Sequence, residues 1–395
     1  MPTRPCWVEI RTHVLEDNFR FLSSLATPSC ELLAVVKADA YGHGLALCAP
    51  AAVRAGAGWL GVTSVEEGAA VRAFCPEARV LIMGGVFPGQ GAEVVRHRLT
   101  PSVWEPFQLD EIEVAARAAG LPPGSLPVHL ELDTGMSRQG VDATGLAAIL
   151  PRFHDGSPLK LEGLMTHLFA ADEADGRVTH EQLALLEQAV EQMQAAGHRA
   201  EWLNAGSSAA LLAGEAGTIA ALAARHGMKP LIRPGLALYG LANVFNPPFV
   251  GEEPAQLQAA RQQLQPVLSW KTRVVSLRSI DAGNVVGYNG TFVATEPMRL
   301  ALLAVGYADG LDRTLGNRFS VLVRGERAPL VGRVSMDQSV IDVTGISGVA
   351  PDDEVVLVGT QGDQTISAQD HADATDTIPW EVFTRIGARV ARVEV

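Results

Sequence analysis

The sequence predicts an N-terminal TIM (β/α)8 barrel followed by a C-terminal mostly-β domain. Short apolar runs alternate with helical stretches over the first part of the chain, the residue pattern changes after Leu241, and short strand-like runs fill the rest. Eight βα units in about 240 residues match a barrel, for which about 250 residues is typical. We place a barrel domain at residues 1–243 and a β-rich domain at 244–395, and leave open that the first ten or so residues pack with the second domain.

Each predicted barrel strand is a short run that ends in Gly, Asp, Thr or Pro near the expected start of a loop. The eight runs are residues 32–36, 59–63, 80–83, 100–103, 128–132, 161–166, 201–203 and 230–232. Between them lie Ala/Leu/Glu-rich segments with a period near 3.6 residues. These segments predict helices, for example over residues 65–74, 109–119 and 180–196.

The second domain begins after a change of residue pattern. Asn246-Pro247-Pro248 and the polar residues 251–265 indicate a linker or excursion. Beyond it, runs rich in Val, Ile and Leu predict strands at residues 268–277, 298–305, 320–323, 330–334, 339–343 and 354–358. A short helix is predicted at residues 367–372.

Composition and charge favour a small-molecule enzyme. The formal net charge is -13, which argues against nucleic acid or an anionic membrane as the main partner, since both need a basic face. No apolar stretch approaches the roughly 20 residues that span a bilayer, and the start lacks a signal peptide's apolar segment, so we expect a cytoplasmic protein. The four cysteines form no C-x-x-C pair, which predicts reduced, buried thiols and no metal site.

Lys37 is the residue that most directly suggests chemistry. It ends an apolar run and opens a glycine-rich loop that contains Tyr41. Burial lowers the pKa of an amine and frees its lone pair to attack an aldehyde, which is how lysines hold pyridoxal 5'-phosphate (PLP). By position alone, the commoner interpretation is a strand-end lysine that reaches solvent.

Other predicted strands also end in polar groups, and in a TIM barrel the functional groups gather at these ends. His167 follows the sixth run and Arg233-Pro234-Gly235 the eighth. Ser207 and Ser208 follow the seventh and precede a helical stretch, where a hydroxyl beside free backbone N–H groups is either an ordinary helix cap or a phosphate seat. The C-terminal ends of the predicted barrel strands therefore present an amine and a candidate anion-binding site together.

Seven strings, in order, resemble the alanine racemase family, and the resemblance covers nearly the whole chain. They are AVVKADAYGHG (34–44), LDTGMSRQG (132–140), EGLMTHLFAADEAD (162–175), RPGLALYG (233–240), VGYNGTF (286–292), VGYADG (305–310) and VGRVSMDQ (331–338). The resemblance implies a PLP-binding barrel plus a β domain, working as a homodimer whose sites combine one subunit's barrel with the other's β domain. It also implies production of D-alanine, a peptidoglycan precursor.

By matching position, Lys37 would hold PLP through a Schiff base and act as one catalytic base. Arg233 would face the pyridine nitrogen, with His167 orienting it. A guanidinium can only donate, so the ring nitrogen would stay unprotonated and the ring would be a weaker electron sink. The resemblance places the phosphate at Tyr41, Ser208, Gly235 and Leu236, with Ser207 and Trp380 also among the cofactor-binding residues.

Inversion at Cα needs a base on each face of the carbon, because one group tends to return the proton to the side it came from. Tyr288 matches the family's second base, which would enter from the partner subunit. Tyr307 and Met336 match partner-subunit residues at the substrate entrance and carboxylate site, and Asp337 lies beside them. Arg138 is expected to contact both cofactor and substrate.

Some positions depart from the family pattern. Glu131 stands where many members carry a carbamylated lysine, and we predict that its carboxylate pairs with Arg138. Ser207 replaces a common asparagine, Ser335 a common cysteine, and Trp380 a tyrosine near the phosphate and the substrate methyl. An indole N–H donates but cannot accept, so the range of substrates stays open.

Three alternatives to an alanine racemase are considered. A serine or broader-specificity racemase is favoured by the change at Trp380. A decarboxylase of similar architecture would lack the arginine at Arg233 and the tyrosine base. A non-catalytic PLP carrier would need Lys37 and the phosphate seat only, and would gain nothing from Tyr288.

Overall fold

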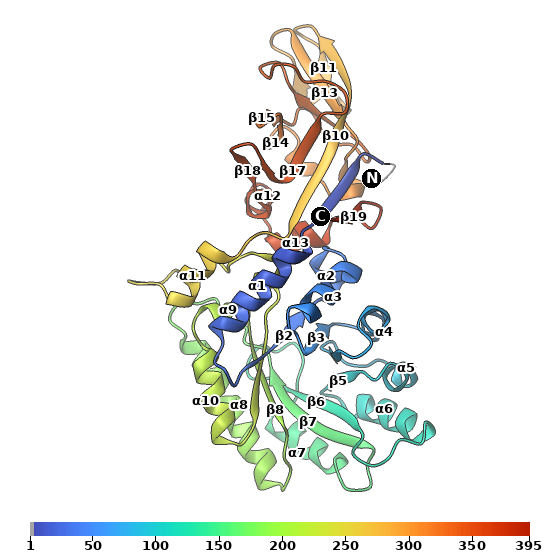
Figure 1. The fold of residues 1–395 in the computed structure, drawn as a ribbon, viewed down its shortest axis with the longest axis vertical. Helices are drawn as coiled ribbons and strands as arrows, with labels where there is room; N and C mark the ends of the chain where they lie inside the picture. Colours follow the sequence, from blue (N-terminus) through green and yellow to red (C-terminus); the bar gives the residue numbers. More distant parts are fainter. Residues whose placement is uncertain (1–3) are drawn as a thin grey trace. The chain divides into compact units, whose positions relative to one another are not determined.

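The computed structural model describes residues 4–395 (Figure 1). The chain forms two compact units. The barrel unit contains residues 13–40 and 48–266, and the β unit contains residues 4–12, 41–47 and 267–395. Residues 244–266 thus group with the barrel, and the N-terminal strand groups with the β unit.

Eight parallel strands close into a barrel in the part of the chain that the structure describes, which confirms the predicted fold class. Sequential strands are neighbours, and the last pairs with the first through Glu31 opposite Leu231. Nearly all strand residues are buried, because helices cover a parallel barrel outside and side chains fill it inside. The strands are β2 (Glu31–Val35), β3 (Trp59–Val62), β4 (Arg79–Ile82), β5 (Thr100–Val103), β6 (Leu126–Leu132), β7 (Leu159–Thr166), β8 (Trp202–Ser207) and β9 (Lys229–Arg233).

The helices follow the strands in alternation (Figure 1). α4 begins after Ser64, whose side chain accepts a hydrogen bond from the Glu67 N–H group, so a capping hydroxyl fixes its first turn. The segment 251–265, interpreted from sequence as a linker or excursion, contains a helix instead. Its buried Leu257 and Ala260 are too few to give a clear period. These helices are α1 (Thr12–Leu25), α3 (Leu45–Arg54), α4 (Val65–Phe74), α5 (Gly91–Arg96), α6 (Pro106–Ala118), α7 (Ala143–Ile149), α8 (Arg177–Ala195), α9 (Ser208–Leu212), α10 (Ala216–Arg225) and α11 (Ala255–Gln263).

The β unit is built around one long strand, β10, which pairs with β1, β13 and β17. β1 runs antiparallel to β10, with Cys6 opposite Thr272, and parallel to β19. The strands of this unit are β1 (Cys6–Ile10), β10 (Leu268–Ile280), β11 (Val285–Val286), β12 (Phe292–Val293), β13 (Met298–Leu303), β14 (Ser320–Val323), β15 (Glu326–Pro329), β16 (Ser339–Asp342), β17 (Glu354–Gln361), β18 (Gln364–Ile366) and β19 (Ala391–Glu394). Its helices are α12 (Ala368–Thr375) and α13 (Pro379–Thr384).

The predicted strand at residues 330–334 was wrong. Leu330 makes only an isolated bridge to Ile341. Gly332 then adopts a φ of +74°, which takes the chain out of the extended conformation, and an added Cβ there would lie 2.7 Å from the Val286 carbonyl oxygen. A close approach of two backbones therefore replaces strand pairing at this point.

No helix in residues 4–395 is long and apolar enough to cross a membrane.

Candidate active site

Lys37 lies two residues after the end of β2, at the C-terminal end of the barrel strands, and opens the turn α2 (Lys37–Tyr41). The next four residues are not glycine, yet all have positive φ, between 52° and 55°. This left-handed turn is held by a 2.9 Å hydrogen bond from the Ala40 N–H group to the Val36 carbonyl oxygen. Each such residue costs roughly 1–2 kcal/mol, and strain of this kind concentrates at functional sites.

The carboxylate of Glu67 anchors the turn to the neighbouring strand end. One oxygen accepts a hydrogen bond from the Ala38 N–H group at 2.6 Å, and the other accepts from the Thr63 N–H group at 2.8 Å. Burial, followed by the charges of Arg138 and Arg233, lowers the pKa of the Lys37 amine, while Glu67 opposes this shift. The lowered pKa increases the fraction of neutral amine, which is the nucleophilic form.

Ser208 forms a compact seat at the junction of β8 and α9. Its hydroxyl oxygen accepts hydrogen bonds from the Gly235 N–H group at 2.9 Å and the Ala237 N–H group at 3.2 Å. The hydroxyl proton therefore remains available to donate to an incoming acceptor, as an anion requires. Ser207 is the cap residue of α9, but its side chain makes no capping hydrogen bond.

Arg233, at the end of β9, is buried and its guanidinium is held by fixed acceptors. It donates to the Asn204 side-chain oxygen, and to the Thr166 carbonyl oxygen at 2.8 Å. Burial lowers the pKa of Arg233 to about 10, so it still carries its charge at neutral pH. His167 faces the same guanidinium, with Nδ1 3.5 Å from Nη2. Burial, then the charges of Arg233, Arg138 and Lys37, lower the pKa of His167 to about 3, which keeps the imidazole neutral.

A buried network that sequence reasoning missed fixes the loop after β7. Gln182 of α8 donates to the Thr134 hydroxyl at 2.9 Å and to the His167 carbonyl oxygen at 3.1 Å. The Thr134 and Thr166 hydroxyls lie 2.7 Å apart, and the Thr166 hydroxyl donates to the Leu132 carbonyl oxygen at 2.9 Å. The only sequence signal was that Thr166 closes one predicted strand and Thr134 follows the end of another.

The predicted pairing of Glu131 with Arg138 was wrong. Glu131 accepts a 2.7 Å hydrogen bond from Gln139, and over residues 4–395 no hydrogen bond or ion pair joins it to Arg138. Backbone hydrogen bonds between Glu131 and Val141 and between Val141 and Asp133 align this stretch with β6. Residues 138 and 139 lie in a bend just before Val141, in which Gln139 faces the carboxylate and Arg138 is exposed. Burial raises the pKa of Glu131, consistent with a neutral amide as its partner.

The β unit carries the remaining predicted residues: Tyr41, Tyr288, Tyr307, Met336, Asp337 and Trp380. Two tight turns are joined by hydrogen bonds from the Tyr307 N–H group to the Ser335 carbonyl oxygen and from the Ala308 N–H group to the Met336 carbonyl oxygen, both 3.0 Å. Tyr288 lies in a short 3-10 turn, and the residue is 67% exposed. Trp380 lies on α13 and is half-buried.

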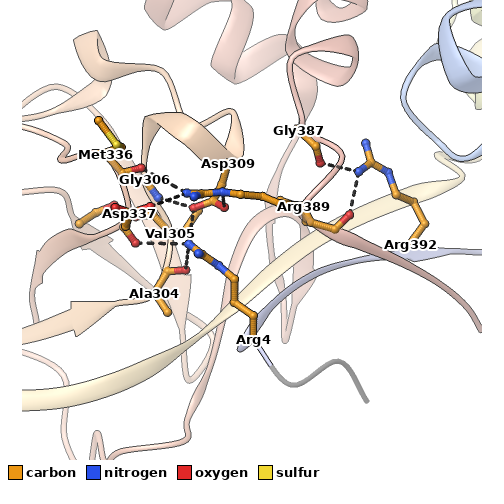
Figure 2. Close-up of polar contacts among 12 residues, drawn as sticks. Arg4, Ala304, Val305, Gly306, Asp309, Met336, Asp337, Gly387, Arg389 and Arg392 are labelled. Carbon is orange, nitrogen blue, oxygen red and sulfur yellow. Dashed lines mark hydrogen bonds and ion pairs between the residues drawn. The ribbon is translucent and has the colours of Figure 1, made fainter.

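Asp309 holds the Tyr307 turn in place (Figure 2). Its fully buried carboxylate accepts hydrogen bonds from the Gly306 N–H group at 2.9 Å and from Arg4 and Arg389, both at 2.7 Å. Arg389 also pairs with Asp337 at 2.8 Å. The N-terminal segment, the two turns and the C-terminal segment thus converge on one carboxylate.

The barrel unit therefore brings Lys37, Arg138, His167 and Arg233 into electrostatic contact and places a separate anion seat at Ser208. No cluster of His, Cys, Asp and Glu in the described part of the chain could hold a metal ion. The site can present an amine of lowered pKa, fixed cationic donors and an anion cradle.

Comparison with known proteins gives a consistent result. The family model described as "Alanine racemase, N-terminal domain" matches residues 10–243, and "Alanine racemase, C-terminal domain" matches residues 267–394. An alanine racemase of Halothermothrix orenii is 37% identical over 391 residues, which is 99% of this chain and 97% of that protein.

Two solved structures extend the comparison. Alanine racemase from Bacillus anthracis with bound L-Ala-P has a TM-score of 0.87 at 29% identity, covering 100% of this chain and 96% of the other. Alanine racemase from Bartonella henselae with covalently bound pyridoxal phosphate has a TM-score of 0.82 at 26% identity and covers 100% of both chains. The chain belongs to the alanine racemase family.

Proposed function

We propose that this chain is a PLP-dependent racemase that interconverts L-alanine and D-alanine. The observation that carries the proposal is the half-buried Lys37 amine, whose pKa is lowered by burial and by the charges of Arg138 and of the fixed Arg233 guanidinium. Membership of the alanine racemase family supports it, as do the solved relatives with bound L-Ala-P and with covalently bound pyridoxal phosphate.

The residues of the barrel unit fit PLP. The Lys37 amine, whose pKa is lowered by burial, suits a covalent bond to an aldehyde. The Ser208 hydroxyl can still donate a proton, and with the backbone of Gly235 and Leu236 it would hold a phosphate. PLP, when bound, withdraws electrons and makes the Cα hydrogen of an amino acid acidic.

Arg233 determines which reaction is favoured. Its guanidinium remains protonated and can only donate, so a ring nitrogen facing it must accept a hydrogen bond. Electron withdrawal is then weaker than with a carboxylate partner, and prompt return of the proton to Cα is favoured over other outcomes. The neutral His167 imidazole accepts toward this guanidinium and supports its orientation.

Proton transfer would use two bases, Lys37 on one face of Cα and Tyr288 on the other. A phenol with an ordinary pKa near 10 needs positive charge nearby to act at neutral pH. Tyr288 is largely exposed in the single chain, as are Tyr307 at 42% and Met336 at 53%. This exposure supports a homodimer in which these side chains complete the partner's site.

The other predicted residues have supporting roles in this proposal. Tyr41, Ser207 and Trp380 would contact the cofactor, Arg138 the cofactor and the substrate, and Asp337 the substrate side with Tyr307 and Met336. All four cysteines are free thiols, which supports a reducing compartment such as the cytoplasm. There the enzyme would supply D-alanine as a peptidoglycan precursor.

The test is to incubate the protein with PLP and L-alanine in deuterated water. We expect optical activity to decay to zero while deuterium enters at Cα, and a Tyr288→Phe variant to retain PLP but lose racemisation. Initial rates on alanine, serine and lysine define the substrate range. Unchanged optical activity with retained Cα hydrogen would refute the proposal.

A further inference from the structure

A line of buried polar side chains runs inside the barrel unit from Arg233 to Arg79. The Arg233 guanidinium donates to the Asn204 oxygen, and the Asn204 amide nitrogen lies 3.3 Å from His129 Nδ1. His129 Nε2 lies 3.7 Å from Glu162 Oε2, which in turn lies 2.6 Å from Arg79 Nη2. The five side chains come from five strands, β9, β8, β6, β7 and β4.

The donors along this line all point the same way. Because Arg233 can only donate, the Asn204 atom that faces it is the oxygen, so the amide nitrogen donates to His129 Nδ1. Burial lowers the pKa of His129, so the ring is neutral and its single proton is on Nε2, facing Glu162. Although burial opposes it, the contacts with His129 and Arg79 lower the pKa of Glu162 and keep it ionised. The hydrogen bonds from Arg233 to Asn204 and from Asn204 to His129 run in one direction, and hydrogen bonds aligned in this way strengthen one another. The Glu162 carboxylate, 3.7 Å from His129 Nε2, acts on them as a nearby charge.

The interior is shaped to hold the imidazole. Asn204 and His129 are fully buried. A Cβ added at Gly163 would lie 2.7 Å from the His129 ring, so glycine leaves the space that the imidazole fills. The Arg79 guanidinium stacks on Trp59, 3.7 Å from the ring centroid, and the Trp59 ring meets the imidazole edge to face.

The buried polar side chains of this line lower the stability of the fold, which suggests that they are kept for a function. Within residues 4–395, His129 Nε2 and Glu162 Oε2 are buried and make no hydrogen bond, and a buried polar atom without a hydrogen bond destabilises the fold. Apolar side chains of similar volume would fill the same space without that cost.

We propose that Asn204, His129 and Glu162 are positioning residues for Arg233. The Glu162 carboxylate, acting through the imidazole and the amide, strengthens the acceptor that holds the guanidinium and fixes which of its N–H groups remain free. The inference rests on the proposed function, in which Arg233 donates to the cofactor's ring nitrogen.

The test uses the PLP-loaded enzyme and the variant Glu162→Gln, with Glu201→Gln as the matched control. Glu201 pairs with Lys229 at 3.0 Å on the surface, and no contact joins it to Arg233. The readouts are the 15N chemical shift of the ring nitrogen in bound PLP, its absorbance spectrum, and kcat with KM for alanine. For Glu162→Gln we expect a changed 15N shift and about a tenfold lower kcat, with KM altered less than about threefold. The control should match the wild type in all three readouts.

A second variant separates positioning from general damage. In Glu162→Gln/Asn204→Asp the carboxylate faces Arg233 directly, so the 15N shift should return toward the wild-type value. If the single variant does not fold, the 15N shift of the double variant still tests the inference. A wild-type 15N shift in Glu162→Gln, or no recovery in the double variant, would overturn the inference. Failure of the wild type to racemise alanine would instead overturn the proposed function.

Discussion

Glu67 is expected to hold the strained turn that carries Lys37. Its two carboxylate oxygens accept backbone N–H groups of Ala38 at 2.6 Å and Thr63 at 2.8 Å. In Glu67→Gln one oxygen remains, while the amide nitrogen that replaces the other faces an N–H donor. A hydrogen bond to a charged group is worth about 1.5–3 kcal/mol, so at this half-buried position we expect a loss of about 2 kcal/mol in the free energy of unfolding.

The same substitution changes the reactivity of Lys37. Glu67 raises the pKa of the amine against the effect of burial, so its removal lowers that pKa further. The pH above which the amine captures PLP should therefore move down. Urea unfolding gives the stability, and the rate of covalent PLP capture, measured by absorbance from pH 6 to 10, gives the second effect.

Glu66→Gln is the matched control on the same helix. Glu66 accepts a hydrogen bond from Gln90 at 2.9 Å on the surface, away from the turn. We expect Glu66→Gln to change the free energy of unfolding by less than about 0.5 kcal/mol and to leave the pH dependence of PLP capture unaltered. If Glu67→Gln behaved like this control in both assays, the role of Glu67 in holding the turn would be refuted.

Three further predictions concern stability. The pKa of His167 is lowered from 6.5 to about 3, so the unfolded state binds more protons than the folded state between these values. The free energy of unfolding should therefore fall by about 1.6 kcal/mol from pH 6.5 to 5; urea titrations at both pH values should show this loss, and His167→Asn should remove it. Asp309→Asn should cost about 2 kcal/mol, because its two arginine partners lose a buried anion but are partly solvated; an unchanged melting temperature would contradict this. Gly163→Ala should cost about 1–3 kcal/mol by crowding the His129 ring, and should lower the urea midpoint.

Much of the barrel could be predicted because local sequence and tertiary structure agree there. The apolar runs are closed by turn residues, and the helix α4 occupies the predicted residues 65–74, with Ser64 as its cap. The helix α11 was missed because its buried face is small. The left-handed turn after Lys37 was also missed. Residues 38–41 include no glycine or asparagine to indicate it, and a side chain distant in sequence, Glu67, stabilises it.

In the candidate site, too, some features could be predicted from local sequence and others depend on tertiary contacts. The positions of Lys37, His167, Ser208 and Arg233 at or just after the ends of barrel strands could be predicted, because strand position is readable from the sequence. The partner of Glu131 could not be found, because a turn decides which of two adjacent side chains faces it. The line of buried polar side chains from Arg233 to Arg79 was missed for a related reason. Its members lie in strands, where the sequence pattern indicates that a side chain is buried but not which other side chains it contacts.

The central claim, that each site combines Lys37 of one chain with Tyr288 of the other, is tested most directly by mixing two inactive variants. Lys37→Ala and Tyr288→Phe are unfolded together, refolded at equal concentrations and assayed for alanine racemisation. Half of the dimers should be mixed, each with one intact site of two, so activity should recover to about one quarter of the wild-type value. No recovery, with mixed dimers present, would contradict the claim.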